Sequence, residues 1–198
     1  QLAIIMEDAF EYDEEKIPTA KVINNLLSLS LSGSLAQAKL AILVSTGSYC
    51  PVHRMHIQIF DEAKSHLERH GYTVIGGVHG TSSPALVQIL TKSIAGYISP
   101  SHDLHVACKL GPQKLIAADH RLKMCEMAVC NSDWVCVSSW ESRLPHPVNF
   151  VTVVNAVQEY TNRVISQHKE LNDAPNIEVF YVCGADLIRR CRLWRSTT

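Results

Sequence analysis

The sequence predicts an α/β protein built on a parallel sheet, and two observations lead to this prediction. The apolar run LAILVSTG at 40–47 ends in a glycine, a pattern typical of a strand buried on both faces. Apolar residues then recur at helical spacing over 55–70, and a second strand pattern, YTVIGGV, follows at 72–78. A strand, a turn, a helix and another strand form a βαβ unit, in which the two strands are parallel.

Composition and charge narrow the class of protein. The 198 residues, 46% of them hydrophobic, are enough for one domain with a buried core. With 18 basic and 19 acidic residues, the net charge of -1 gives no reason to expect binding to nucleic acid or to a membrane surface. The seven cysteines are scattered, and neither a secretory signal nor an apolar stretch of roughly 18–20 residues stands out. We therefore expect a cytoplasmic or nuclear protein with reduced thiols, and, because the chain begins at Gln1, a fragment or processed form.

The chain divides into an N-terminal extension, residues 1–39, and a domain over 40–198. The extension contains a helical pattern at 21–40 that is interrupted at Gly33. Beyond the βαβ unit, residues 80–95 are interpreted as an inserted loop with a short helix, and residues 96–103 as a loop whose course Pro100 sets.

The remainder of the domain continues to alternate helices with strands. The predicted helices and strands are a helix at 114–130, a strand at 134–141, a helix near 148–171 and a strand at 177–186. This alternation extends the parallel sheet.

The turn STGSYCPVHRMH, residues 45–56, is the first candidate site. Gly47 permits close approach of a ligand to the backbone, and the helix that follows presents free N–H groups and the positive end of its dipole, which suits phosphate. His53 and His56 lie three residues apart, so both imidazoles can point at the same anion. Two alternatives remain open: an ordinary turn with exposed histidines, and a zinc site formed by Cys50 with both histidines. The zinc site lacks a matching second pair of ligands.

Two further strand ends carry polar or aromatic residues. Asp186, in YVCGAD, can accept hydrogen bonds from a ribose or an amide, or can cap a helix. Trp140 and Glu141, in SSWES, can stack on a planar ring and accept from a polar group on it, whereas the alternative for Trp140 is a core tryptophan. Trp194 has the same two interpretations. No G-x-S-x-G elbow and no P-loop occurs, which argues against a serine hydrolase and a P-loop NTPase.

The order of these motifs resembles a known family. GSYCPVHRMH is similar to the nucleotide-binding turn G-x-[FY]-x-P-x-[HT]-x-x-H of the nucleotidyltransferase superfamily. The succession YISPSHD, AADHRLKMCEMAV, DWVCVSSWES, VCGADL and LWRS resembles the eukaryotic nicotinamide mononucleotide adenylyltransferases over roughly residues 40–195, with an insertion near 79–95. The resemblance implies a Rossmann-like nucleotidyltransferase fold, with a parallel sheet covered by helices on both faces.

The resemblance also implies a reaction. The enzyme would join nicotinamide or nicotinate mononucleotide to ATP and release pyrophosphate, giving NAD or its deamido form. The mononucleotide phosphate would attack the ATP α-phosphate directly, with Mg²⁺ held mainly through the ATP phosphates. Of other nucleotides, a cytidylyltransferase is the weaker alternative, because a tryptophan at SSWES suits a pyridine ring. The sequence leaves open the choice between nicotinamide and nicotinate, and a homo-oligomeric state.

Residue roles carry over from the same resemblance. Gly47, Ser48 and Tyr49 would line the phosphate turn, His56 would hydrogen-bond the ATP phosphates, and His53 would stand beside it. Lys114, with Lys109 as the alternative, would meet the mononucleotide phosphate. Trp140 and Trp194 would bracket the pyridine ring near Glu141, while Gly184 and Asp186 would contact the adenylate and its ribose.

One motif of the family has no counterpart. Nothing matches the later I-S-S-T-x-x-R segment that grips the ATP phosphates, so we expect a fold incomplete at its C-terminus. We therefore also expect weak or absent turnover by this chain alone, and keep a second hypothesis, a truncated, non-catalytic nucleotide-binding or interaction protein of the same fold.

Overall fold

The computed structural model describes residues 14–74 and 95–192, in which five parallel strands form one sheet. The strands are β1 (Lys39–Gly47), β2 (Tyr72–Val74), β3 (Ala95–Pro100), β4 (Val135–Val137) and β5 (Ile177–Tyr181). The helices are α1 (Ala20–Leu31), α2 (Arg54–Arg69), α4 (Asp103–Leu110), α5 (Ala118–Val129), α6 (Trp140–Arg143), α7 (Phe150–Ser166) and α8 (Ala185–Cys191).

β1 is the centre of the sheet. Residues 42–44 of β1 pair with both β3 and β5, so these two strands lie on opposite edges of β1. β4 pairs with the far edge of β3, which gives the order β4–β3–β1–β5. The chain thus builds outward in one direction from β1 and then returns to its other edge, which is the topology of a doubly wound, Rossmann-like sheet. The predicted fold class is confirmed.

β2 and β3 occupy one continuous edge of β1. Ala41 pairs with Val74, and the next residue, Ile42, pairs with Ala95. Leu40 and Ala41 also pair with β5, so β2 must lie on the same side of β1 as β3. The two short strands are therefore collinear, and the register passes from Val74 to Ala95 without a gap.

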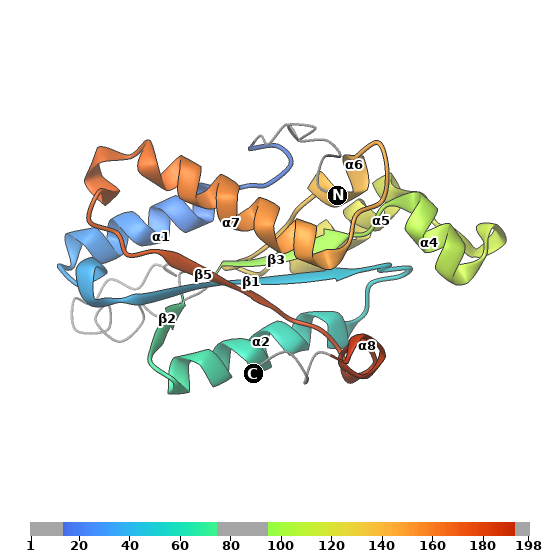
Figure 1. Ribbon diagram of the computed structural model, residues 1–198, viewed down its shortest axis with the longest axis horizontal. Coiled ribbons are helices and arrows are strands. Elements are labelled where there is room, and N and C mark those ends of the chain that lie inside the picture. Colours follow the sequence, from blue (N-terminus) through green and yellow to red (C-terminus); the bar gives the residue numbers. More distant parts are fainter. Residues whose placement is uncertain (1–13, 75–94, 193–198) are drawn as a thin grey trace, which may run out of the picture.

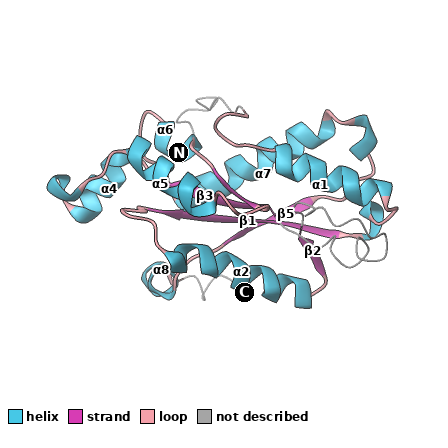
Figure 2. Cartoon of the chain, turned by 180° about the vertical axis from the view of Figure 1, so that it is seen from behind, coloured by secondary structure: helices cyan, strands magenta, loops and turns pink. Residues whose placement is uncertain are grey.

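Helices cover both faces of the sheet. α1 and α7 lie above it and α2 and α8 below it in Figure 1, and Figure 2 shows the same layers from behind. The alternation along β1 explains the two layers: Leu40, Ile42 and Val44 join the core cluster of α1 and α7, whereas Ala41 and Leu43 join that of α2 and α5. Both faces are thus apolar, as expected for a parallel strand buried on both sides.

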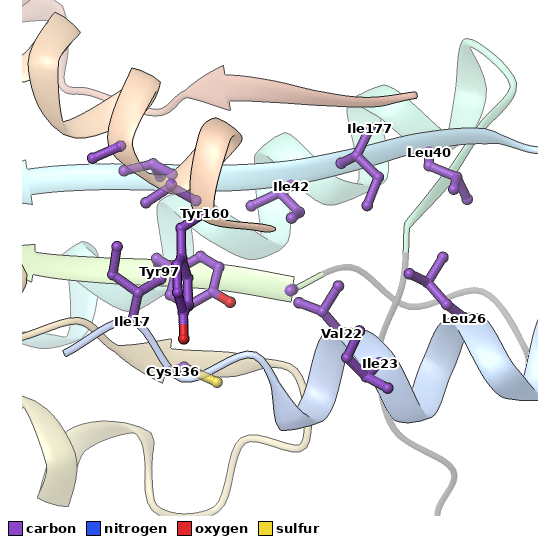
Figure 3. Packing of buried hydrophobic residues seen from close by; sticks show 14 of the residues in the cluster. Ile17, Val22, Ile23, Leu26, Leu40, Ile42, Tyr97, Cys136, Tyr160 and Ile177 are labelled. Atoms are coloured by element: carbon purple, nitrogen blue, oxygen red, sulfur yellow. The ribbon is translucent and has the colours of Figure 1, made fainter. Parts of the chain in front are cut away.

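The segment before β1 packs into the first cluster. Ile17, Val22 and Leu26 are fully buried against the sheet (Figure 3). The hydroxyl of Tyr97, in β3, donates to the backbone oxygen of Pro18 at 2.7 Å. Ile17 and the buried face of α1 are therefore part of the same core as the sheet.

Two predictions of local structure are wrong. Residues 96–103 are not a loop, because Ala95–Pro100 is a fully buried strand between β1 and β4, and Pro100 stands at its end, where the missing N–H is tolerated. The strand expected at 134–141 ends at Val137, and Trp140 and Glu141 lie in the short helix α6. The predicted strand residues 75–78 and most of the segment 80–95 lie outside the described residues.

Candidate functional site

The turn after β1 leads directly into the N-terminus of α2. Tyr49 has φ 43°, in the left-handed region, and its hydroxyl donates to the backbone oxygen of Ser45 at 3.1 Å. A Cβ atom at Gly47 would lie 3.2 Å from the ring of Tyr49, so the glycine leaves room for that ring. The turn is consequently folded back on β1, and Ser48 lies between the strand and the helix.

His53 and His56 form a stacked pair at the start of α2. His53 is the N-cap residue, and its backbone amide donates to Nδ1 of His56 at 3.1 Å. The ring centroids lie 3.5 Å apart, with 23° between the planes. Burial, the neighbouring His53 and the charge of Lys109 lower the pKa of His56 to about 4. His56 is thus neutral near pH 7, and because Nδ1 accepts, its proton sits on Nε2, which is free to donate to an anion.

The two candidate lysines are neighbours of this turn. Lys109 is close enough for its charge to lower the pKa of His56. The backbone oxygen of Lys114 lies 3.4 Å from Sγ of Cys50, which makes it a neighbour of the turn. Both lysine side chains are exposed.

The ends of β3 and β4 bring a buried carboxyl group beside the turn. Ser99 donates to Oε2 of Glu141 at 2.9 Å, and the side chain of Glu141 is 3% exposed. Burial raises the pKa of Glu141 to about 7, although hydrogen bonds from Ser101 and Ser99 and the charge of Arg121 act in the opposite direction. Trp140 is 1% exposed and belongs to the main core cluster.

The end of β5 lies along the other edge of β1. Val182 donates to the backbone oxygen of Val44 at 2.7 Å, and Tyr181 shares a 2.8 Å hydrogen bond with Thr46. Gly184 is the N-cap residue of α8, and Asp186 stands in the first turn of that helix rather than at the cap.

The carboxylate of Asp186 lies close to Gly184 and Arg190. A Cβ atom at Gly184 would lie 2.7 Å from Oδ1 of Asp186, so only glycine at position 184 leaves room for the carboxylate in this orientation. Asp186 faces Arg190 at 3.8 Å and is largely exposed. Its carboxylate can therefore accept hydrogen bonds from a ligand.

The structure brings most of the predicted site residues to one edge of the sheet. All strands are parallel, so the turn at 47–49, Glu141 and Asp186 each follow the carboxyl end of a strand, with the β1 turn in the middle. The strand order reverses at β1, which is where open α/β sheets bind ligands. Trp194 lies outside the described residues.

Metal ligation by the protein finds no support in the described ranges. Among residues 14–74 and 95–192, no group of three or more His, Cys, Asp or Glu side chains could hold a metal ion. A cavity of about 560 Å³ opens elsewhere, between residues 15–16, α5 and the end of β4, and includes none of the predicted site residues.

Sequence reasoning missed several polar partners at this edge. Arg121, Asp103, Ser99 and Ser101 lie in YISPSHD and AADHRLKMCEMAV, which we recognised as motifs without assigning a role to any residue in them. The signal for Arg121 was the motif alone, because an arginine in a helical pattern normally faces solvent. None of the described helices is long and apolar enough to cross a membrane.

A central β1 with strands on both edges, followed by a glycine turn and a helix with two histidines at its start, defines a Rossmann-like nucleotidyltransferase fold. Comparison with known proteins narrows the class. The chain is 30% identical over 148 residues to a nicotinamide/nicotinic acid mononucleotide adenylyltransferase of Oryza sativa and 29% identical over 162 residues to that of Arabidopsis thaliana. It is also 38% identical over 101 residues to nicotinamide/nicotinic acid mononucleotide adenylyltransferase 2 of Xenopus tropicalis. The chain is therefore homologous to the eukaryotic nicotinamide/nicotinate mononucleotide adenylyltransferases.

The similarity covers only part of each relative. The matches take in 81%, 75% and 50% of this chain, but 55%, 48% and 25% of the Arabidopsis, Oryza and Xenopus proteins respectively. The chain thus spans about half the length of the plant relatives. No protein-family model matches it.

Proposed function

We propose that the chain carries the nucleotide-binding half of an adenylyltransferase site, which transfers AMP from ATP to nicotinamide or nicotinate mononucleotide in NAD biosynthesis. The observation that supports this most is the stacked His53–His56 pair at the N-terminus of α2, shortly after the central strand, in which His56 has a pKa lowered to about 4. Nucleotidyl transfer needs positioning and charge neutralisation more than a protein nucleophile, and this turn offers donors for both.

Each side chain has a proposed task. Nε2–H of His56, together with free backbone N–H groups at the N-terminus of α2, would donate to the ATP phosphates. Gly47, Ser48 and Tyr49 would line the phosphate pocket, with His53 holding the ring of His56 in place. A lysine, Lys114 or Lys109, would neutralise the mononucleotide phosphate.

The adenylate and pyridine ends would lie on either side of the turn. Gly184 and Asp186 would contact the adenylate, where the carboxylate accepts from the ribose. On the opposite side, Glu141 would meet the mononucleotide, with Trp140 and Trp194 bracketing its ring. Mg²⁺ would bind through the ATP phosphates.

The burial of Trp140 favours a second candidate function. A ring that is 1% exposed presents no free face for a pyridine to stack on. In this second candidate the chain binds the adenine nucleotide alone and does not transfer it, as a non-catalytic nucleotide-binding or interaction protein.

Calorimetric titration combined with a turnover assay distinguishes the two candidates. ATP with Mg²⁺ and nicotinamide mononucleotide are titrated separately, and dinucleotide formation is followed by chromatography. Binding of both with product formation supports the transferase, whereas binding of ATP alone without product supports the second candidate. A folded chain that binds neither contradicts both.

A matched pair of histidine variants on α2 supplies the control. His56→Ala should weaken ATP binding and lower any turnover by about 10²-fold, the usual cost of losing one donor to a transition-state charge. His66→Ala, on the same helix, should change neither, because His66 is exposed and its ring lies beside that of His70, away from the start of α2. Equal effects of the two substitutions would rule out a specific role for His56.

A further inference from the structure

Arg121 is a fully buried guanidinium that the proposed chemistry does not use. Its side chain is 0% exposed, and its donors reach four oxygens from three segments of the chain. Nε donates to the backbone oxygen of Ile116 at 2.8 Å, and Nη1 to that of Ser48 at 3.0 Å. Nη2 donates to the backbone oxygen of Ser101 at 2.6 Å and to Oδ1 of Asp103 at 2.7 Å.

Three of these partners, Ser48, Ser101 and Asp103, belong to the two loops that form the candidate site. Ser48 lies in the turn after β1, whereas Ser101 and Asp103 follow β3. The amide of Ser101 also donates to the backbone oxygen of Gly47 at 2.9 Å, so the two loops already touch at one point. Arg121 adds a second and a third connection, because it donates to Ser48 on one side and to both Ser101 and Asp103 on the other. Together these contacts fix an orientation that a single hydrogen bond would leave free to rotate.

Only an arginine can make this set of contacts. Its planar fork directs five N–H donors in fixed directions, and these bonds satisfy three backbone oxygens together with a carboxylate. Lysine would keep the charge but has a single nitrogen, so it cannot reach both loops with the same geometry. The charge is matched by Asp103 and faces the buried Glu141.

We infer that Arg121 is a positioning residue, which holds the Ser48 carbonyl against the β3 loop so that the turn and the His53–His56 pair face a bound phosphate. This inference rests on the proposed function, since it deepens the role of the same turn. It concerns the phosphate end of the ligand, and it leaves the adenosine end, at Gly184 and Asp186, untouched.

Arg121→Lys is the test variant, because it keeps the charge and removes the fork. Inorganic triphosphate and adenosine are titrated calorimetrically as separate probes, and urea unfolding reports stability. We expect about tenfold weaker triphosphate binding with adenosine binding unchanged. A folded variant that binds triphosphate as tightly as the wild type overturns the inference, and equal losses for both probes also overturn it, because they indicate a general structural defect.

A measurement without ligand separates this inference from the proposed function. The pKa of His56 is followed by NMR in the wild type and in Arg121→Lys, where it should move up toward its ordinary value as the turn loosens and His56 gains solvent. Because Arg121→Lys keeps the positive charge, a shift in the pKa of His56 would report a change in the geometry of the turn. If the wild type binds neither probe, the proposed function fails, and the NMR measurement alone then tests the role of Arg121. A shift in the pKa of His56 supports the positioning role, and an unchanged pKa overturns it.

Two further variants guard against misfolding. Asp103→Asn removes the carboxylate partner at a partly exposed position and leaves Arg121 in place, so it should weaken triphosphate binding about two- to threefold in a folded protein. Lys123→Met, two residues away on α5, removes an exposed ion pair with Glu126 and should change the binding of neither probe. If Arg121→Lys does not fold, an unchanged triphosphate affinity in Asp103→Asn overturns the inference.

Discussion

Nδ1 of His56 accepts a hydrogen bond of 3.1 Å from the backbone amide of His53. This contact has the geometry of the capping box, in which the third residue of a helix bonds back to the amide of the N-cap residue. It uses a histidine where glutamate or glutamine is usual, so the residue that closes the helix end also keeps a second nitrogen for a ligand.

The low pKa of His56 predicts a specific pH dependence of stability. The group titrates at about 4 in the folded chain against 6.5 when unfolded, so the unfolded chain binds more protons between these values. The contribution of His56 to stability is therefore complete above pH 6.5 and is lost as the pH falls toward 4.

His56→Gln isolates this effect. Glutamine at the third helical position can accept from the His53 amide but does not titrate. Urea unfolding at pH 7 and pH 5 should show a smaller loss of stability on acidification in His56→Gln than in the wild type. His66→Gln serves as the control, and identical pH slopes in wild type and His56→Gln would contradict the prediction.

The buried Glu141 predicts the opposite trend toward alkaline pH. Its pKa is about 7 in the folded chain against 4.5 in the unfolded one, so the folded chain binds the extra proton and stability falls as the pH rises through 7. Glu141→Gln keeps an acceptor for Ser99 and removes the charge. It should match the wild type at pH 4, below both pKa values, and be more stable at pH 8, by about 3 kcal/mol at most. A variant that is less stable at pH 8 would show that the ionised carboxylate is favoured in the fold.

The unbroken register between β2 and β3 predicts that residues 75–94 can be removed. Joining Val74 to Ala95 would leave every pair with β1 in place. A shorter connection costs less chain entropy to close, by up to about 2–3 kcal/mol for about 20 residues. The free energy of unfolding of the deletion variant should therefore equal that of the wild type or exceed it by no more than this amount.

A deletion one residue shorter is the matched control. Removing 75–93 leaves Ile94 between Val74 and Ala95. Either β2 or β3 must then shift by one residue along β1, which turns the side chains of the shifted strand to the opposite face. Thermal unfolding of both variants should show the 75–94 deletion at or above the wild type and the 75–93 deletion well below it. If both behave alike, β2 and β3 do not act as one strand.

The close approach at Gly184 predicts a loss of ligand binding without a loss of fold. Gly184→Ala places a Cβ atom 2.7 Å from Oδ1 of Asp186, and the carboxylate can rotate away at little cost. Adenosine binding should weaken about five- to tenfold, while the free energy of unfolding changes by about 0.5 kcal/mol or less. Calorimetric titration and urea unfolding measure the two effects, and full adenosine affinity would exclude Asp186 from the site.

Local patterns in the sequence were enough for β1, α2 and α7. The apolar run at 40–47, the helical spacing at 55–70 and the valines of 148–171 predicted these elements to within a few residues. Residues 96–103 were assigned to a loop because one glycine, one proline and two serines dominate their local signal. The burial of Ala95–Pro100 depends on β1 and β4, which are distant in sequence.

The sequence by itself determined the order of strand, turn and helix around His53 and His56, because apolar runs, turn residues and helical spacing act over neighbouring residues. The tertiary structure alone decided which strand ends meet: parallel strands pair across long connections, so the places of Ser99, Glu141 and Asp186 beside the turn follow from the sheet order. The tertiary structure also decided that Arg121 is buried. A charge can be buried only where partners surround it, and the partners of Arg121 come from segments up to 73 residues away in the chain.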